Sequence, residues 1–319
     1  GADLKMTRHF DPVTAVHFHE RDPGSDWTRD PWIALDLDSP LDSDSILTPN
    51  VVRLPAGGYR IYYTGLGPAH PDPGAVGYIL SARSDDAGPW TKEEGIRLDL
   101  HGPHAATRTL CPDVIPLPGG GWRMYYEARS GDEPTVILSA VSADGLSWEL
   151  EEGVRVGDGE WSYGTPRCLY LEDGRRRLYF HRYIHPRSPD PNGGRQILSA
   201  LSSDGLEWEI EPGVRIAQET ARETFAVYSP EVVRLGDGSY RMYYAAWSEG
   251  INGGVFTATS TDGLAWRKEP EPCLDLGGPL DGNMVSEPCV TELPDGRFRL
   301  FYEASDGRNK RILSATSSS

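Results

Sequence analysis

The chain has 319 residues, of which 38% are hydrophobic, so it can bury a sizeable core in one large domain or two ordinary ones. Its 48 acidic and 31 basic residues give a formal net charge of −17, which argues against nucleic acid and anionic membranes as partners. No apolar run approaches the roughly 20 residues that span a bilayer, and we see no leader. We therefore expect a soluble, cytoplasmic protein, with a removed signal peptide as the alternative.

The composition favours strands and turns over helices. The chain contains 36 glycines and 26 prolines, and its short apolar runs lie between Gly-Asp, Asp-Gly and Gly-Gly turns. It has almost no stretch with a 3.6-residue period, so we predict an all-β protein. The four cysteines lack CxxC spacing, which argues against a zinc knuckle and gives no disulfide framework.

The first complete structural unit covers residues 48–100. A Pro-centred strand, Thr48–Leu54, is followed by a glycine turn and an aromatic strand, Tyr59–Tyr63. The apolar strand Ile79–Ala82 comes next, and a turn leads to Trp90, which opens a short fourth strand. Four strands in about 60 residues indicate one small antiparallel sheet.

The same unit recurs along the chain. The Pro-centred strand returns at Cys111-Pro-Asp113, Thr165-Pro-Arg167, Ser229-Pro-Glu231 and Glu287-Pro-Cys289. The turn before the fourth strand has the form Ser-x-Asp-Gly-x-x-Trp in three copies, which end at Trp148, Trp208 and Trp266. Five such units predict one domain over residues 1–319, a five-bladed β-propeller with four-stranded blades.

The N-terminal segment supplies the strand that the last unit lacks. The fifth copy ends after its third strand, Ile312–Ala315, whereas residues 27–37 match the fourth-strand segment of the first unit, residues 90–100. We therefore expect residues 27–37 to complete the last blade and close the ring, with residues 1–26 as an N-terminal extension. The Arg29-Asp30-Pro31 triplet then lies on an outermost strand, where we expect a structural role.

Charged residues on the inner strands indicate the functional site. Side chains alternate along a strand, so the residues just before and just after each proline should share the face toward the propeller axis. The sequence therefore places five polar or charged side chains in one axial space: Asn50, Asp113, Arg167, Glu231 and Glu287. They form either a functional site with mutually repelling carboxylates or a structural salt-bridge plug. We favour the functional site.

The ends of the second strands and the loops beside them give a second set. The equivalent positions there are Thr64, Glu127, His181, Ala245 and Glu303. Neighbouring segments carry further candidates, which are His104, Trp161 and Trp247. Carboxylates inside a cavity and aromatic rings at its rim suit a sugar, because hydroxyl groups need acceptors and the C–H face of the ring stacks on aromatic rings.

These motifs resemble the five-bladed glycoside hydrolases of the arabinanase, levansucrase and invertase type. The likeness rests on the Ser-x-Asp-Gly-x-x-Trp turns, the five Pro-centred strands and the N-terminal closure, and it extends from about Trp27 onward. The family implies an Asp as base or nucleophile in the first blade, an orienting Asp in a later one and a Glu next to proline as general acid. Here Thr48 and Asn50 stand where the first Asp belongs, whereas Glu287-Pro288 matches the acid.

The first hypothesis is a glycosidase acting on a small carbohydrate. Acetal hydrolysis needs a protonated carboxyl at the leaving oxygen and an ionised one near the anomeric carbon. We assign Glu287 as acid, Asp113 as base or nucleophile and Glu231 as the group that separates their pKa values. The remaining candidates would bind substrate: Asn50, Arg167, His181, Glu127, Glu303, His104, Trp161 and Trp247.

Two alternatives follow from the missing first-blade Asp. One is a lyase, cyclase or isomerase on the same scaffold, with a divalent metal held by His181 and nearby carboxylates. The other is a carbohydrate-binding protein without catalysis. We expect no cofactor for the hydrolase.

Overall fold

The computed structural model describes residues 16–190 and 194–318, which form 21 strands and one short 3₁₀ helix, Ala221–Glu223. The all-β prediction is confirmed. Within these residues no helix is long and apolar enough to cross a membrane.

Three antiparallel four-stranded sheets follow one another along the chain, in agreement with the repeat. Their strands are β3 (Ser45–Arg53), β4 (Tyr59–Leu66), β5 (Tyr78–Ser84) and β6 (Thr91–Lys92); β7 (Arg108–Pro116), β8 (Trp122–Arg129), β9 (Val136–Ser142) and β10 (Glu149–Leu150); and β11 (Ser162–Tyr170), β12 (Arg176–Tyr183), β13 (Gln196–Ser202) and β14 (Glu209–Ile210).

The remaining nine strands belong to one sheet, in which β1 (Phe18–His19) pairs with β15 at one end. One part contains β15 (Ala226–Leu235), β16 (Tyr240–Ser248), β17 (Ile251–Ser260) and β18 (Arg267–Lys268), and the other contains β19 (Met284–Glu292), β20 (Phe298–Ser305), β21 (Lys310–Ser317) and β2 (Trp27–Arg29). A short parallel pairing of β17 with β19, at Asn252–Met284 and Gly253–Val285, joins the two parts.

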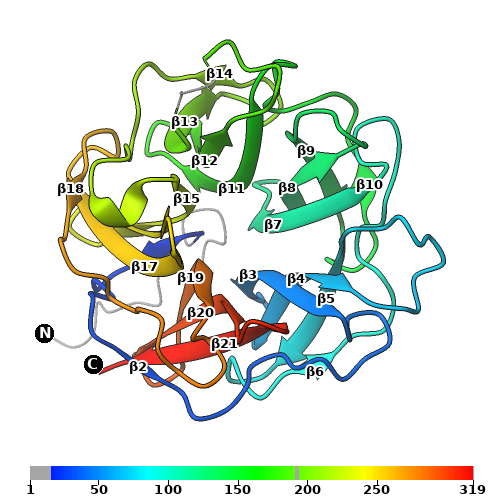
Figure 1. Ribbon diagram of the computed structural model, residues 1–319, viewed down its shortest axis with the longest axis horizontal. Helices are drawn as coiled ribbons and strands as arrows, with labels where there is room; N and C mark the ends of the chain where they lie inside the picture. Colours follow the sequence, from blue (N-terminus) through cyan, green and yellow to red (C-terminus); the bar gives the residue numbers. More distant parts are fainter. Residues whose placement is uncertain (1–15, 191–193, 319) are drawn as a thin grey trace, which may run out of the picture.

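The sheets surround a common axis, with β3, β7, β11, β15 and β19 nearest to it (Figure 1). Each of these inner strands contacts the next, and β19 contacts β3. Apolar clusters fill the spaces between neighbouring sheets; one of them, for example, packs Ile61 and Tyr63 against Phe301 and Ile312. Each sheet therefore buries its faces against its neighbours.

The recurring Asp-Gly turn ties adjacent sheets together. In the second unit the Asp144 carboxylate accepts hydrogen bonds from the backbone N–H groups of Leu146 and Ser147. Trp148 packs edge-on against Tyr62 of the preceding sheet, whose hydroxyl donates to the Gly145 carbonyl at 2.8 Å. The turn thus has the structural role that the sequence predicts.

The N-terminal segment pairs with the sheet that contains β19, β20 and β21. The strand β2 pairs antiparallel with β21, and Leu35 forms a bridge with Ile312. Asp30 accepts hydrogen bonds from Ser314 and Thr316, which confirms a structural role for the Arg-Asp-Pro triplet. The strand β1 (Phe18–His19) pairs parallel with β15, so part of the predicted extension is built into the fold; residues 1–15 lie outside the described residues.

Each inner strand carries a bulge at its proline. The residue before proline has a positive φ between 48° and 54° in all five copies: Thr48, Cys111, Thr165, Ser229 and Glu287. The pairing register shifts at the same places, for example between Leu47 and Asn50. The bulge interrupts the two-residue alternation of side chains. The prediction that the residues before and after proline share one face toward the axis is therefore wrong, and the two groups make separate sets of contacts.

Candidate functional site

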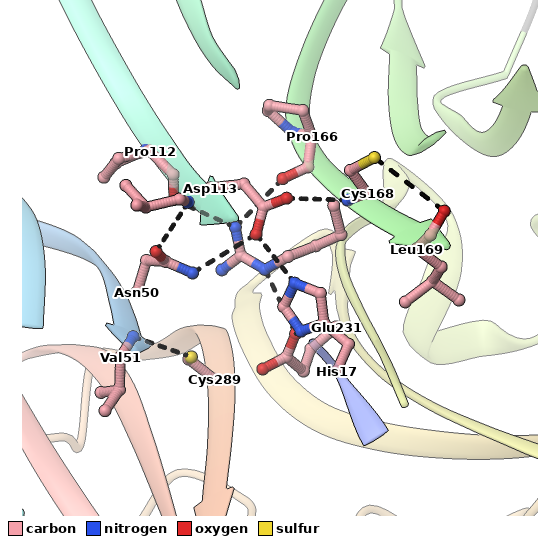
Figure 2. A network of polar contacts seen from close by, with 12 residues as sticks. His17, Asn50, Val51, Pro112, Asp113, Pro166, Cys168, Leu169, Glu231 and Cys289 are labelled. Carbon is pink, nitrogen blue, oxygen red and sulfur yellow. Dashed lines mark hydrogen bonds and ion pairs between the residues drawn. The ribbon is translucent and has the colours of Figure 1, made fainter. Parts of the chain in front are cut away.

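The residues after proline form a ring of contacts between neighbouring inner strands (Figure 2). The Asn50 Oδ1 atom accepts from Val114 N at 3.0 Å, Asp113 Oδ2 from Cys168 N at 2.7 Å, and Glu231 Oε2 from Val290 N at 2.7 Å. The fifth position is Cys289, whose Sγ accepts from Val51 N at 3.3 Å. Each contact satisfies a backbone donor of the following sheet, so this ring holds the sheets together.

Arg167 and His17 occupy the space that these side chains leave. The Arg167 guanidinium donates to Glu231 Oε1 at 3.2 Å and to three proline carbonyls, those of residues 49, 112 and 166. His17, from the N-terminal segment, places Nε2 2.9 Å from Asp113 Oδ1 and Nδ1 3.5 Å from Glu231 Oε1. Burial alone would lower the pKa of His17, but the two carboxylates raise it.

We call Asn50, Asp113, Arg167, Glu231 and His17 the axial network. The side chains of Asp113 and Glu231 are fully buried, and every oxygen of the two carboxylates has a hydrogen-bond or ion-pair partner. These contacts favour the structural plug over the functional site that we expected for Asp113 and Glu231. His17 had no sequence signal, because its segment belongs to no repeat.

The residues before proline contact the ends of the second strands instead. Thr48 Oγ1 lies 2.6 Å from Thr64 Oγ1, Cys111 Sγ 2.7 Å from Glu127 Oε1, and Thr165 Oγ1 2.7 Å from His181 Nδ1. The pair β15 and β16 has Ser229 and Ala245 at these positions, and the pair β19 and β20 has Glu287 and Glu303. We call this end of the ring the mouth.

Three carboxyl groups gather at the mouth, and we call Glu127, Glu287 and Glu303 the glutamate cluster. Burial, followed by the charges of Glu303 and Glu127, raises the pKa of Glu287 well above its usual value. Burial also raises the pKa of Glu303, but Lys310 and hydrogen bonds from the Thr48 N–H and the Ser286 hydroxyl oppose that rise. The carboxyls of Glu287 and Glu303 therefore differ in their surroundings, and Glu287 binds a proton more tightly than Glu303 does.

Glu127 reaches into a gap that a glycine provides. A Cβ atom on Gly164 would lie 2.1 Å from Glu127 Oε2 and 3.1 Å from His181 Nε2. Glu127 Oε2 is buried and has no hydrogen-bond partner in the part of the chain that the structure describes. Burial raises the pKa of Glu127, and the nearby Arg108 guanidinium opposes that rise. Gly164 is a site residue that the sequence analysis missed, since its role depends on contacts between two sheets.

His181 is held as a neutral imidazole. Its Nδ1 atom accepts a hydrogen bond from Ser229 N at 3.3 Å, and burial, followed by Arg195 and Arg108, lowers its pKa to about 3. With Nδ1 occupied, the proton resides on Nε2. Within the described parts of the chain no three His, Cys, Asp or Glu side chains are arranged to hold a metal ion.

The raised pKa of Glu287 predicts a pH-dependent stability. The folded protein binds a proton here more tightly than the unfolded chain, so this contribution is fully present below about pH 4.5 and is lost as the pH rises through the folded pKa. We expect the free energy of unfolding of the parent to fall over that range relative to Glu287→Gln. Urea titrations of both proteins at several pH values measure this difference, and parallel curves would contradict the prediction.

Filling the gap at Gly164 should displace the carboxylate of Glu127. The backbone of Gly164 has no positive φ, so Gly164→Ala is expected to fold and to move the flexible end of Glu127. We expect activity to fall at least about tenfold and the melting temperature to change by only a few degrees. Adding Glu127→Asp, which shortens the acid, should restore part of the activity. Full activity in Gly164→Ala alone would exclude a role for the position of Glu127.

The remaining predicted residues lie at separate places. His104 is exposed in a loop, and Trp161 is buried beneath the Arg182 guanidinium, 4.2 Å from the ring centre. Trp247 lies near the end of β16 and lines a pocket there. All four cysteines are free thiols.

No known protein-family model matches the chain. Two curated relatives are "Uncharacterized protein Rv1502" and "Uncharacterized protein MT1551", from two strains of Mycobacterium tuberculosis. Each is 34% identical over 191 residues, or 59% of this chain. The matched region spans 62% of the length of each relative.

Solved structures share the architecture at low sequence identity. A "Glycoside hydrolase" has a TM-score of 0.74 at 17% identity, covering 91% of this chain and 92% of its own. A thermostable family-43 glycoside hydrolase has a TM-score of 0.71 at 20% identity, covering 86% and 91%. An N-acetylgalactosamine deacetylase from F. plautii has a TM-score of 0.66 at 16% identity, covering 92% and 95%. The chain therefore has the propeller fold found in glycoside hydrolases.

Proposed function

We propose that the protein is a single-domain, five-bladed propeller that hydrolyses a glycoside of a small carbohydrate. The circuit of contacts from β3 through β7, β11, β15 and β19 back to β3 supports five blades, and the pairing of β2 with β21 supports closure by the N-terminal segment. The fold shared with glycoside hydrolases supports the reaction class.

The glutamate pair of the fifth blade carries the proposal. Glu287 follows Ser286, which is the residue paired with Glu303 across the two strands. The four equivalent residues before proline are buried, whereas Glu287 is partly exposed. A proton-holding carboxyl that reaches solvent, beside a hydrogen-bonded carboxylate, is the pair that acetal hydrolysis requires.

The two carboxyls divide the reaction between them. Glu287 donates its proton to the glycosidic oxygen as the bond from that oxygen to the anomeric carbon breaks. A water molecule adds its oxygen to the anomeric carbon, and Glu303 accepts the proton that the water loses. Transfer of this proton from Glu303 to the neighbouring Glu287 restores the starting state. This scheme moves the base role that we first assigned to Asp113 onto Glu303.

The test is turnover of 4-nitrophenyl glycosides by the intact chain. The panel includes pyranosides, furanosides and uronides in both anomeric configurations, and we expect nitrophenol release from at least one of them. The rate should fall on the alkaline side as Glu287 loses its proton. No release from any substrate would overturn the proposal.

The alternative is a non-hydrolytic enzyme or a binding protein on the same scaffold. It is motivated by Thr48 and Asn50 in the first unit, where the resembling family has an Asp, and by the deacetylase that shares this fold. Binding of a sugar without any turnover would favour the binding protein.

A further inference from the structure

A pocket of about 340 Å³ opens near the ends of β12 and β16. Arg195 forms a backbone bridge with Ala226 on β15, and Ala226 lies opposite Trp247 on the neighbouring strand β16. The backbone at Arg195 therefore lies beside β15, and β15 lies beside β16. The pocket is lined by Ile184, Gly194, Arg195, Gln218, Thr224, Phe225 and Trp247. We call it the Arg195 pocket.

Arg195 has no acidic partner among the described residues. Several other partly buried arginines of this acid-rich chain do pair with a carboxylate, as Arg123 does with Glu151 and Arg177 with Glu211, both at 2.7 Å. The Arg195 guanidinium instead lies over the Trp247 ring, 5.4 Å from its centre. Its planar set of donors is therefore available to a carboxylate from outside the chain.

The other walls suit the body of a sugar. Phe225 is 46% exposed and meets Trp247 edge-on with ring centres 5.5 Å apart, which gives an apolar wall for C–H groups. The Gln218 amide donates to the carbonyls of Glu223 and Thr224, so its oxygen is left to accept from a hydroxyl. The pocket thus offers one cation, one acceptor and an aromatic surface.

The charges at the mouth restrict where a negative group can lie. The glutamate cluster would repel an anion near Glu287, whereas the positive charge of Arg195, next to β13, acts on this end of the ring and helps to lower the pKa of His181. An acidic substrate would therefore place its carboxylate at Arg195 and its glycosidic bond toward Glu287.

We propose that the Arg195 pocket binds the carboxylate of a uronic acid, so that the substrate is an acidic glycoside. The substrate assignment rests on the proposed hydrolase function, but binding in the pocket can be measured without turnover.

The experiment is calorimetric titration of the intact protein with the methyl glycosides of glucuronic and galacturonic acid, compared with those of glucose and galactose. We expect at least one uronide to bind about tenfold or more tightly than its neutral counterpart. Arg195→Gln should remove that preference, and Arg195→Lys should restore only part of it, because lysine lacks the bidentate geometry. Arg267→Gln, on the exposed strand β18, is the charge-matched control and should bind like the parent.

The outcomes separate the two proposals. Loss of uronide binding in Arg195→Gln with a parental melting temperature supports the pocket, even if no glycoside is hydrolysed. Hydrolysis of neutral glycosides, with no uronide binding or with equal binding by Arg195→Gln, overturns the pocket and leaves the hydrolase standing. Equal competition by inorganic phosphate would also overturn it, since the site would then recognise any anion.

Discussion

Replacing Glu231 by glutamine is expected to lower the free energy of unfolding by about 3–5 kcal/mol, the usual cost of breaking a buried ion pair. The Glu231 side chain is fully buried and contacts Arg167, His17 and the backbone of Val290. Glutamine retains an acceptor for Val290 but leaves the Arg167 guanidinium without its nearest negative charge. The melting temperature should fall by several degrees, measured by calorimetry.

Two controls make this result specific. Glu133→Gln removes a partner of an exposed ion pair with Arg187 and should leave the melting temperature unchanged. Glu231→Gln combined with Arg167→Met removes both charges and should recover part of the lost stability, because no unpaired charge remains buried. If the single variant Glu231→Gln were as stable as the parent but inactive, Glu231 would instead have a functional role, as the sequence analysis predicted.

The repeat explains why the fold was predictable from the sequence. Each copy contains its own turn and strand signals, and a sheet built from one copy can bury its faces only against similar sheets. The N-terminal strand was found in the same way, because residues 27–37 resemble a segment of the first unit. Local patterns were enough for these features.

The division of the polar residues into two groups was not predictable. Strict alternation placed Glu287 with Asp113 and Glu231, but the positive φ of 54° at Glu287 shifts the register there. Glu287 therefore joins Glu303, and Cys289 takes its place in the ring between the sheets. The sequence gives no sign of these bulges. None of the five residues before proline is glycine, and a positive φ is rare for any other residue.

Contacts from outside the repeat were also hidden. His17 completes the axial network from a segment without internal similarity to the rest of the chain, and Gly164 matters only through the side chains that it admits from β8 and β12. Arg195 was hidden for another reason. Its lack of an acidic partner among the described residues becomes a signal only once the pairing of the other arginines is known.

Replacing Glu287 by glutamine is expected to reduce kcat by about 10²–10⁴, since glutamine cannot donate a proton to the leaving oxygen. Stability should be unchanged or higher at neutral pH, because the substitution removes a partly exposed acid whose ionised form Glu303 and Glu127 repel. Steady-state kinetics on the best nitrophenyl glycoside, together with thermal melts, measure both effects. Glu292→Gln, near the far end of the same strand, is the matched control and should retain parental activity.

The neighbouring substitution distinguishes a proton donor from a merely structural acid. The charge of Glu303 raises the pKa of Glu287, so Glu303→Gln should move the alkaline limb of the remaining activity to lower pH. A role for Glu287 in packing alone would leave the position of that limb unchanged. Parental kcat in Glu287→Gln would remove this residue from the reaction.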